Sequence, residues 1–158
     1  MTLDEITKFW FNNKQLWFNS SSNNDLIIKS KFNHIFVNAP LLVDSTHLLV
    51  DNIVNNTHLL ANILLYDQIS RHIYRDNKDQ IKYNDNIAYK YALICLPFIE
   101  DYLPEERCFI LMPLRHTFEE DNLNICLTYI NKWRNEDDLS IYKRFYEATI
   151  KALSKIKT

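Results

Sequence analysis

The chain of 158 residues contains no glycine at all. Glycine is the residue that enters positive φ without a steric penalty, so every turn that needs such a conformation must be made by another residue type. Asparagine and aspartate tolerate the left-handed region best, and we expect them at those positions. The lack of glycine also excludes a glycine-rich phosphate cradle, and with it the Rossmann and P-loop nucleotide sites.

Helical spacing of apolar residues dominates the rest of the chain. No strand-length alternation competes with it, so the sequence predicts an all-α fold of six to eight antiparallel helices joined by short loops. Asn24, Thr57 and Asn84 are the expected N-caps of three helices, and Pro104 is expected in the first turn of another. The expected helices cover residues 3–11, 25–38, 58–76, 85–96, 104–112, 119–133 and 139–155.

Length and composition indicate one folded unit. With 47% hydrophobic residues the chain can bury a core, and we expect a single domain over residues 1–158. No apolar run is long enough to span a bilayer and the start lacks the order of a secretory signal, so we expect a cytoplasmic protein without membrane partners. The three cysteines are too widely spaced for a disulfide framework or a thiolate zinc site, and the abundance of Asn, Ile, Lys and Tyr indicates an AT-rich genome.

Charge is balanced over the whole chain but not along it. The net charge is −2, which does not indicate nucleic-acid binding, although a nucleic-acid partner stays open. Residues 139–158 hold five bases and one acid, and we interpret this segment as a solvated helix face. The oligomeric state cannot be inferred from the sequence.

Residues 60–75 hold the pattern that bears most directly on function. At about 100° of rotation per helical residue, one stripe of this helix changes from apolar to charged without a helix breaker. Charges that follow an apolar stripe face the core or a cleft beside it, so they must be paired or bound to a ligand. The stripe consists of Leu60, Leu64, Asp67, Gln68, Arg71 and Arg75.

Two interpretations of this stripe stay open at this stage. In the structural one, Asp67 and Arg71 form an intrahelical salt bridge and Arg75 caps a neighbouring helix or reaches solvent. In the functional one, the arginines present their forked donors to an anion, or Asp67 acts with a partner from elsewhere in the chain.

Three segments together resemble a known family. They are F-W-F at 9–11 followed by W-F at 17–18, then L-L-Y-D-Q-I-S-R at 64–71, then M-P-L-R-H at 112–116. Their order and spacing are similar to a mostly bacterial family, the domain of unknown function nine hundred and twenty-four. The resemblance covers about residues 1–135 and implies an all-helical fold similar to tetratricopeptide arrays. It carries over Trp10, Trp17, Asp67, Gln68, Arg71, Arg75, Pro113 and His116, with Asp25 and Asp85 as weaker matches.

The chain departs from the family pattern at three places. Ser70 and His72 stand where the family has proline and asparagine, so we expect a less kinked helix. An acid usually follows the family's histidine by two residues, whereas Phe118 occupies that position and Glu119 comes one residue later. The family's usual closing segment, F-G-R-F-P-H-R-N, has no counterpart here.

The candidate site residues follow from the stripe and the resemblance. His116 and Asp67 are the candidate catalytic residues, although a histidine beside a proline turn is more often structural. Trp10 and Trp17 are candidates for stacking on a ligand, against the alternative that they pack the first helix. We expect no metal ion and no cofactor. The predicted ligand-binding residues are Gln68, Arg71, Arg75, Trp10 and Trp17.

These residues predict a polar cleft that binds an anionic ligand containing a phosphate or a carboxylate. The first alternative is a hydrolase or transferase that acts on a phosphate-containing, nucleotide or RNA substrate through His116 and Arg71. The second is a helical protein-interaction module that uses the array itself. Whether the protein is an enzyme stays open at this stage.

Overall fold

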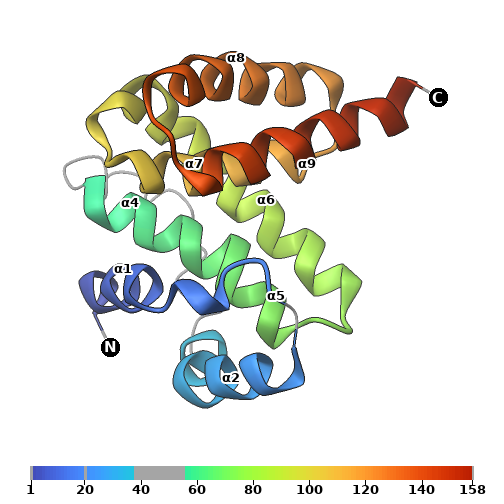
Figure 1. Ribbon diagram of the computed structural model, residues 1–158. Helices are drawn as coiled ribbons and strands as arrows, with labels where there is room; N and C mark the ends of the chain where they lie inside the picture. The colour runs from blue at the N-terminus through green and yellow to red at the C-terminus, as the bar shows by residue number, and fades with distance from the viewer. Residues whose placement is uncertain (1, 20, 38–55, 158) are drawn as a thin grey trace. The chain divides into compact units, whose positions relative to one another are not determined.

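The computed structural model describes residues 2–19, 21–37 and 56–157, without the side chains of 37, 56 and 57. These residues form helices and connecting turns and no strand, which confirms the all-α prediction (Figure 1). The chain divides into two compact units, Met1–Cys95 and Leu96–Thr158. The expected single domain and the tetratricopeptide-like array stay predictions.

The first unit begins with a short, firmly capped helix, α1 (Leu3–Asn12). Thr2 and Glu5 form a capping box, in which each side chain bonds the backbone N–H of the other residue. The remaining elements are η1 (Lys14–Leu16), α2 (Ser22–Val37), α4 (Asn56–Ile63), the π-helical segment η2 (Leu64–Ile69), α5 (Ser70–Ile73) and α6 (Lys78–Cys95).

Two of the expected N-caps are wrong. The hydroxyl of Ser21 accepts from the backbone N–H of Asn24 at 3.1 Å, so α2 begins at Ser22 and Asn24 lies in its first turn. Asn77 caps α6 in the same way through the N–H of Gln80, at 3.1 Å. Asn84 therefore lies inside α6, where its side chain is buried. Residues 38–55 and the side chain of Thr57 lie outside the described residues.

The helix α4 is the centre of the first unit. Its residues 59–61 and 63 are at most 1% exposed, and it packs against both α1 and α6 (Figure 1). The segment η2 and α5 continue it without a break, and α2 packs against α5. The continuous helix ends at Ile73, three residues earlier than expected.

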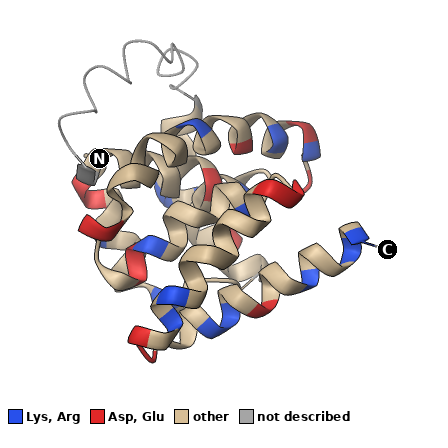
Figure 2. Cartoon of the chain, turned by 90° about the horizontal axis from the view of Figure 1, so that it is seen from above, with Lys and Arg blue, Asp and Glu red and all other residues tan. Residues whose placement is uncertain are grey.

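The second unit consists of η3 (Leu96–Asp101), α7 (Pro104–Arg115), α8 (Glu120–Glu136) and α9 (Ser140–Lys157). The three α-helices pack pairwise against one another. Pro104 is the first residue of α7, as expected, and Glu106 accepts from the N–H of Leu103 at 2.9 Å. Figure 2 shows the basic residues spaced along α9, the helix that ends at the C-terminus.

Trp133 anchors the core of the second unit. Its ring is fully buried, and it lies 5.4 Å from the ring of Tyr129 and 6.0 Å from that of Tyr142, measured between centroids. Its indole N–H donates to the carboxylate of Glu100 at 3.0 Å, which lowers the pKa of Glu100. The guanidinium of Arg107 lies over the same ring. One aromatic side chain therefore connects η3, α7, α8 and α9.

The residues with positive φ are not the ones expected. Within the described residues they are Phe18, at φ 57°, and Phe118, at φ 53°. Bulky residues are rare in this conformation because the Cβ atom crowds the backbone. The expectation of Asn or Asp at these positions is wrong for both, so each turn stores a local steric penalty that the surrounding structure offsets.

The three cysteines are buried thiols that pair with no other cysteine. Burial raises the pKa of Cys108, and it raises that of Cys126 to about 12. In the described part of the chain, no helix combines the length and the hydropathy that crossing a membrane requires.

Candidate functional site

The regular α-helical geometry of α4 ends at the motif that the sequence singled out. Residues 64–69 are π-helical, so the backbone N–H of Ser70 donates to the carbonyl of Leu65, five residues earlier. The hydroxyl of Ser70 donates to the carbonyl of Tyr66. All six residues of the segment are buried. A π segment inside a longer helix turns the following side chains relative to the α-helical spacing on which the sequence prediction was based.

Four side chains form what we call the polar cluster: Asp67, Gln68, Arg71 and Asp85. Asp67 is fully buried, and Gln68 donates to its Oδ2 at 2.6 Å. Arg71 donates through Nη2 to Oδ1 of Asp85 at 2.7 Å, and this pair is partly exposed. A carboxylate oxygen of Asp67 and one of Asp85 lie within 4.8 Å of each other. Two carboxylates and one guanidinium thus meet between η2, α5 and α6.

The ion pair of Arg71 differs from the one that the sequence suggested. The expected alternative was an intrahelical bridge to Asp67, whereas Arg71 bonds Asp85, which is 14 residues further along the chain. The Nε atom of Arg71 is buried and has no hydrogen-bond partner among the described residues. One N–H donor of the guanidinium therefore has no acceptor among the described protein groups.

Asp25, His72 and Arg75 form a second set of contacts, the Asp25 network. Arg75 bonds both carboxylate oxygens of Asp25 through Nε and Nη2, each at 2.6 Å. His72 Nδ1 lies 2.9 Å from Oδ1 of Asp25, so its Nδ1–H donates to the carboxylate. These contacts join α2 to α5 and to the turn that follows it.

Hydrogen bonds and burial in the Asp25 network shift the pKa values of all three of its members. The hydrogen bond from Arg75 lowers the pKa of Asp25 and, in return, raises that of Arg75. Burial lowers the pKa of His72, and this effect outweighs the hydrogen bond to Asp25, which raises it. The neutral imidazole is therefore the favoured form of His72 in the folded chain.

The predicted ligand-binding tryptophans lie beside this network. Trp10 is 0% exposed, and its ring stacks on that of Trp17 at 6.5 Å and meets His72 edge to face at 6.5 Å. The indole N–H of Trp17 donates to the carbonyl of Trp10 at 3.0 Å. These contacts are typical of packing, which was the alternative interpretation, and ligand binding by either residue stays a prediction.

His116 belongs to the second unit. It is the C-cap residue of α7, its side chain is half-buried, and its N–H donates to the carbonyl of Met112 at 2.9 Å. The guanidinium of the preceding Arg115 lies 4.8 Å from the ring centroid of Phe145. The catalytic role of His116 stays a prediction.

Three functional candidates were weak or missing in the sequence interpretation. Asp25 and Asp85 were the less secure matches to the family, yet they are the ion-pair partners of Arg75 and Arg71. His72 was noted only as a departure from the family, and it turns out to be a buried member of the Asp25 network. Only their positions relative to the family motif singled these residues out.

The described residues define an all-α protein whose first unit holds a polar cluster on a π-helical segment. The family described as "Bacterial protein of unknown function (DUF924)" matches residues 6–157, so the chain belongs to this family. This match confirms the resemblance inferred from the three motifs, and it extends past residue 135, the expected end of the similar region. Neither a curated protein nor a solved structure matches the chain.

Proposed function

We propose that the protein binds a small ligand with an anionic group, a phosphate or a carboxylate, at the polar cluster. The observation that supports this most is the buried Nε of Arg71, which lacks a hydrogen-bond partner among the described residues. An unsatisfied buried donor costs about 1–3 kcal/mol. An acceptor oxygen of an anion would remove this cost and would use the planar fork of the guanidinium.

The carboxylates of the polar cluster narrow the class of ligand. Asp67 and Asp85 bring two acceptor groups to within 4.8 Å, and Arg71 is the cation bonded to Asp85. A simple inorganic anion would gain from the arginine but would be repelled by the second carboxylate. A ligand that also carries hydroxyl or amino donors fits better, because these groups bond to the carboxylates while the anion bonds to Arg71.

The position of the polar cluster supports a binding role over a purely structural one. π segments within α-helices are enriched at functional sites, since their wider turn is less favourable than the α-helix that could replace it. Here the segment contains Asp67 and Gln68 and directly precedes Arg71. Side-chain exposure of 32% for Arg71 and 22% for Asp85 leaves the cluster open to solvent from that side.

Thermal unfolding with added ligands tests the proposal. Inorganic phosphate, ribose 5-phosphate and citrate, none of which carries an aromatic ring, are compared on the wild type, Arg71→Gln and Arg71→Lys. Binding to the folded state alone stabilises it by about 2.7 kcal/mol at a ligand concentration of 100 Kd, which raises the melting temperature by several degrees. We expect the shift to disappear in Arg71→Gln and to be much reduced in Arg71→Lys, which keeps the charge without the fork.

Two controls make the result specific. Arg134→Gln removes the same charge from an exposed arginine that lies over Tyr146 in the second unit, and it should leave the shift intact. Arg75→Gln shows whether the second arginine contributes to binding, as predicted, or serves only the Asp25 network. A shift that survives in a folded Arg71→Gln variant, or the lack of any shift in the wild type, contradicts the proposal.

A further inference from the structure

A pocket of about 400 Å³ lies between α1 and α2, and none of its lining residues belongs to the polar cluster. Its lining comes mainly from one stripe of α1, because residues 5, 8, 9 and 12 follow the three- and four-residue spacing of a helix face. The opposite side is Lys31 of α2. The lining residues are Glu5, Lys8, Phe9, Asn12, Asn13 and Lys31.

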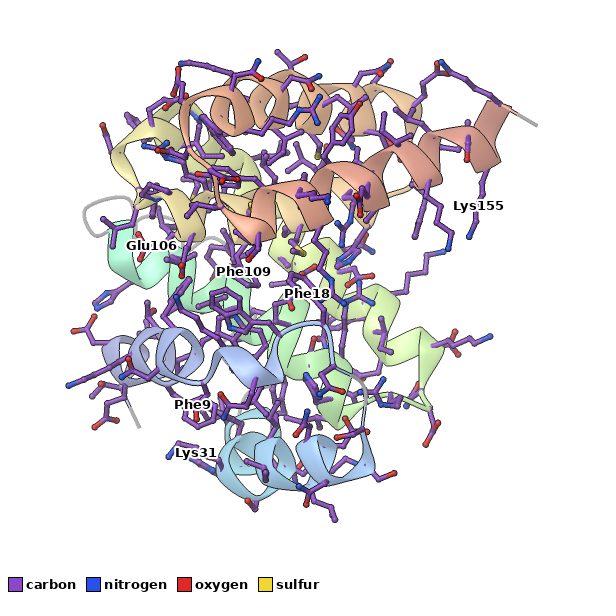
Figure 3. The ribbon with its side chains drawn as sticks, viewed as in Figure 1. Phe9, Phe18, Lys31, Glu106, Phe109 and Lys155 are labelled. Carbon is purple, nitrogen blue, oxygen red and sulfur yellow. The ribbon has the colours of Figure 1, made fainter. Side chains whose placement is uncertain are left out.

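The apolar wall of the pocket is fixed by aromatic packing. The ring of Phe9 meets that of Phe32 edge to face, with centroids 5.1 Å apart, and Phe32 is fully buried. The side chain of Lys31 lies over the ring of Phe9, with Nζ 5.1 Å from the centroid. Figure 3 labels both side chains, which lie between α1 and α2.

Both ends of α1 hold the pocket residues in place. Glu5 is one half of the capping box at the start of the helix. At the other end, the amide of Asn13 donates to the carbonyl of Phe9 at 2.7 Å. A wall with capped ends changes little when a ligand enters, so less ordering is needed for binding.

The pocket presents more positive than negative charge. Lys8 and Lys31 are both exposed, and within the described residues neither ammonium has a carboxylate partner. The one acid of the lining, Glu5, already accepts from the N–H of Thr2 at 2.8 Å. A carboxylate or phosphate between the two lysines would form charge-assisted hydrogen bonds, which are stronger than an exposed cation–π contact.

We propose that this pocket binds a planar aromatic anion, with its ring against Phe9 and its anionic group between Lys8 and Lys31. The ring of the ligand replaces the ammonium of Lys31 over the ring of Phe9, and this ammonium moves to the anionic group of the ligand. The amide of Asn12 supplies a further donor and acceptor at the edge of the ring. The volume fits a ligand of nucleotide or benzoate size.

Calorimetric titration and ¹H–¹⁵N spectra of the full chain test this site. Adenosine monophosphate and benzoate are the two aromatic anions, one with a phosphate and one with a carboxylate. Adenosine has the ring without the charge, and inorganic phosphate has the charge without the ring. We expect at least one aromatic anion to bind, with shifts concentrated in residues 3–12 and around residue 31. Adenosine and phosphate should each bind about tenfold more weakly or worse, a loss of about 1.4 kcal/mol or more.

Variants assign the binding to the pocket. Lys8→Gln and Lys31→Gln should each weaken binding about tenfold, and Phe9→Leu should weaken it while the melting temperature shows that the variant is folded. Lys14→Gln is the matched control, since Lys14 also lies over an aromatic ring, that of Trp17, outside the pocket. Unchanged affinity in both pocket-lysine variants, shifts centred on residues 67–85, or no saturable binding of either aromatic anion would overturn the proposal.

Discussion

The two units of the chain bury different kinds of side chain. In the first unit, the buried polar residues include an aspartate and a histidine, Asp67 and His72. In the described second unit they are Asn122 and Thr149, which carry no charge. In the described second unit, Glu100 forms ion pairs with Lys132 and Arg107; Glu100 and Lys132 are exposed, whereas Arg107 is largely buried. Burial of an ionisable group costs desolvation energy that its hydrogen-bond partners offset only in part, so the first unit gives up stability at Asp67, where a binding site is proposed.

The largest expected effect tests the apolar side of this comparison. Trp133→Ala removes the ring that connects the helices of the second unit and leaves Glu100 without its indole donor. We expect a loss of about 3–5 kcal/mol in the free energy of unfolding, measured by chemical denaturation. Trp133→Phe, which keeps most of the volume, should lose much less. A loss below about 1 kcal/mol for Trp133→Ala would show that this core does not depend on the ring.

The next effect tests whether the polar cluster is structural. Asp85→Asn leaves the partly buried Arg71 without its carboxylate, and we expect a loss of about 1–2 kcal/mol after solvent screening. The double variant Arg71→Leu with Asp85→Leu should recover that loss if the pair is retained for binding and not for stability. A double variant that is less stable than either single variant would mean that the ion pair itself supports the fold.

A pH effect separates the Asp25 network from the rest of the chain. The folded-state pKa of His72 lies below the unfolded value of 6.5, so the unfolded chain binds more protons between these two values. The contribution of neutral His72 to the free energy of unfolding is therefore fully present above about pH 6.5, and it is lost as the pH falls toward the folded-state pKa. Asp25, whose folded pKa lies below 3.8, adds a further loss only in more acidic solution.

The measurement is the melting temperature between pH 7.5 and 5 for the wild type and His72→Asn. We expect the decline to be shallower in His72→Asn, because asparagine does not titrate while the remaining histidines are common to both proteins. Equal slopes for the two proteins would remove His72 as the cause.

The smallest effect compares the two positive-φ turns. Phe118→Gly should stabilise the chain by about 0.5–1 kcal/mol, because glycine removes the steric penalty at φ 53° and the exposed ring contributes little packing. Phe18→Gly should gain less or lose stability, since its half-buried side chain contributes to packing. Differential scanning calorimetry on both variants measures this contrast. A destabilised Phe118→Gly would show that the ring is needed for the turn.

The helices were largely predictable from the sequence, but the starts of α2 and α6 were not. Apolar spacing marks a buried face, and it located every helix whose face is apolar. The first turn of α6 is polar throughout, so apolar spacing did not mark it and the cap was placed at Asn84 instead of Asn77. Local preference for Asn at caps and turns was also outweighed at Phe18 and Phe118, where tertiary packing determines the backbone.

The candidate site was predictable in its residues but not in its contacts. Asp67, Gln68 and Arg71 were found from one stripe and one family motif, whereas the pairing of Arg71 with Asp85 depends on how α6 packs. The π segment could not be inferred, because its hydrogen bonds span five residues and leave no simple sequence pattern. A catalytic role for His116 stays a prediction, and turnover and melting temperature of His116→Ala test it. A role of the protein in protein interaction also stays a prediction.

The π segment also determines how the chain tolerates changes in length. A π turn accommodates one more residue than the α turn it replaces, so deletion of a single residue from 64–69 would restore regular α geometry and preserve the apolar contacts of α4. Arg71, which follows the segment, would keep nearly the same orientation, because five residues in α geometry turn the helix by about the same angle as six in π geometry. Chains shortened by one residue at this point would thus keep the scaffold and the position of Arg71, while the side chains inside the segment, Asp67 and Gln68 among them, would be placed differently.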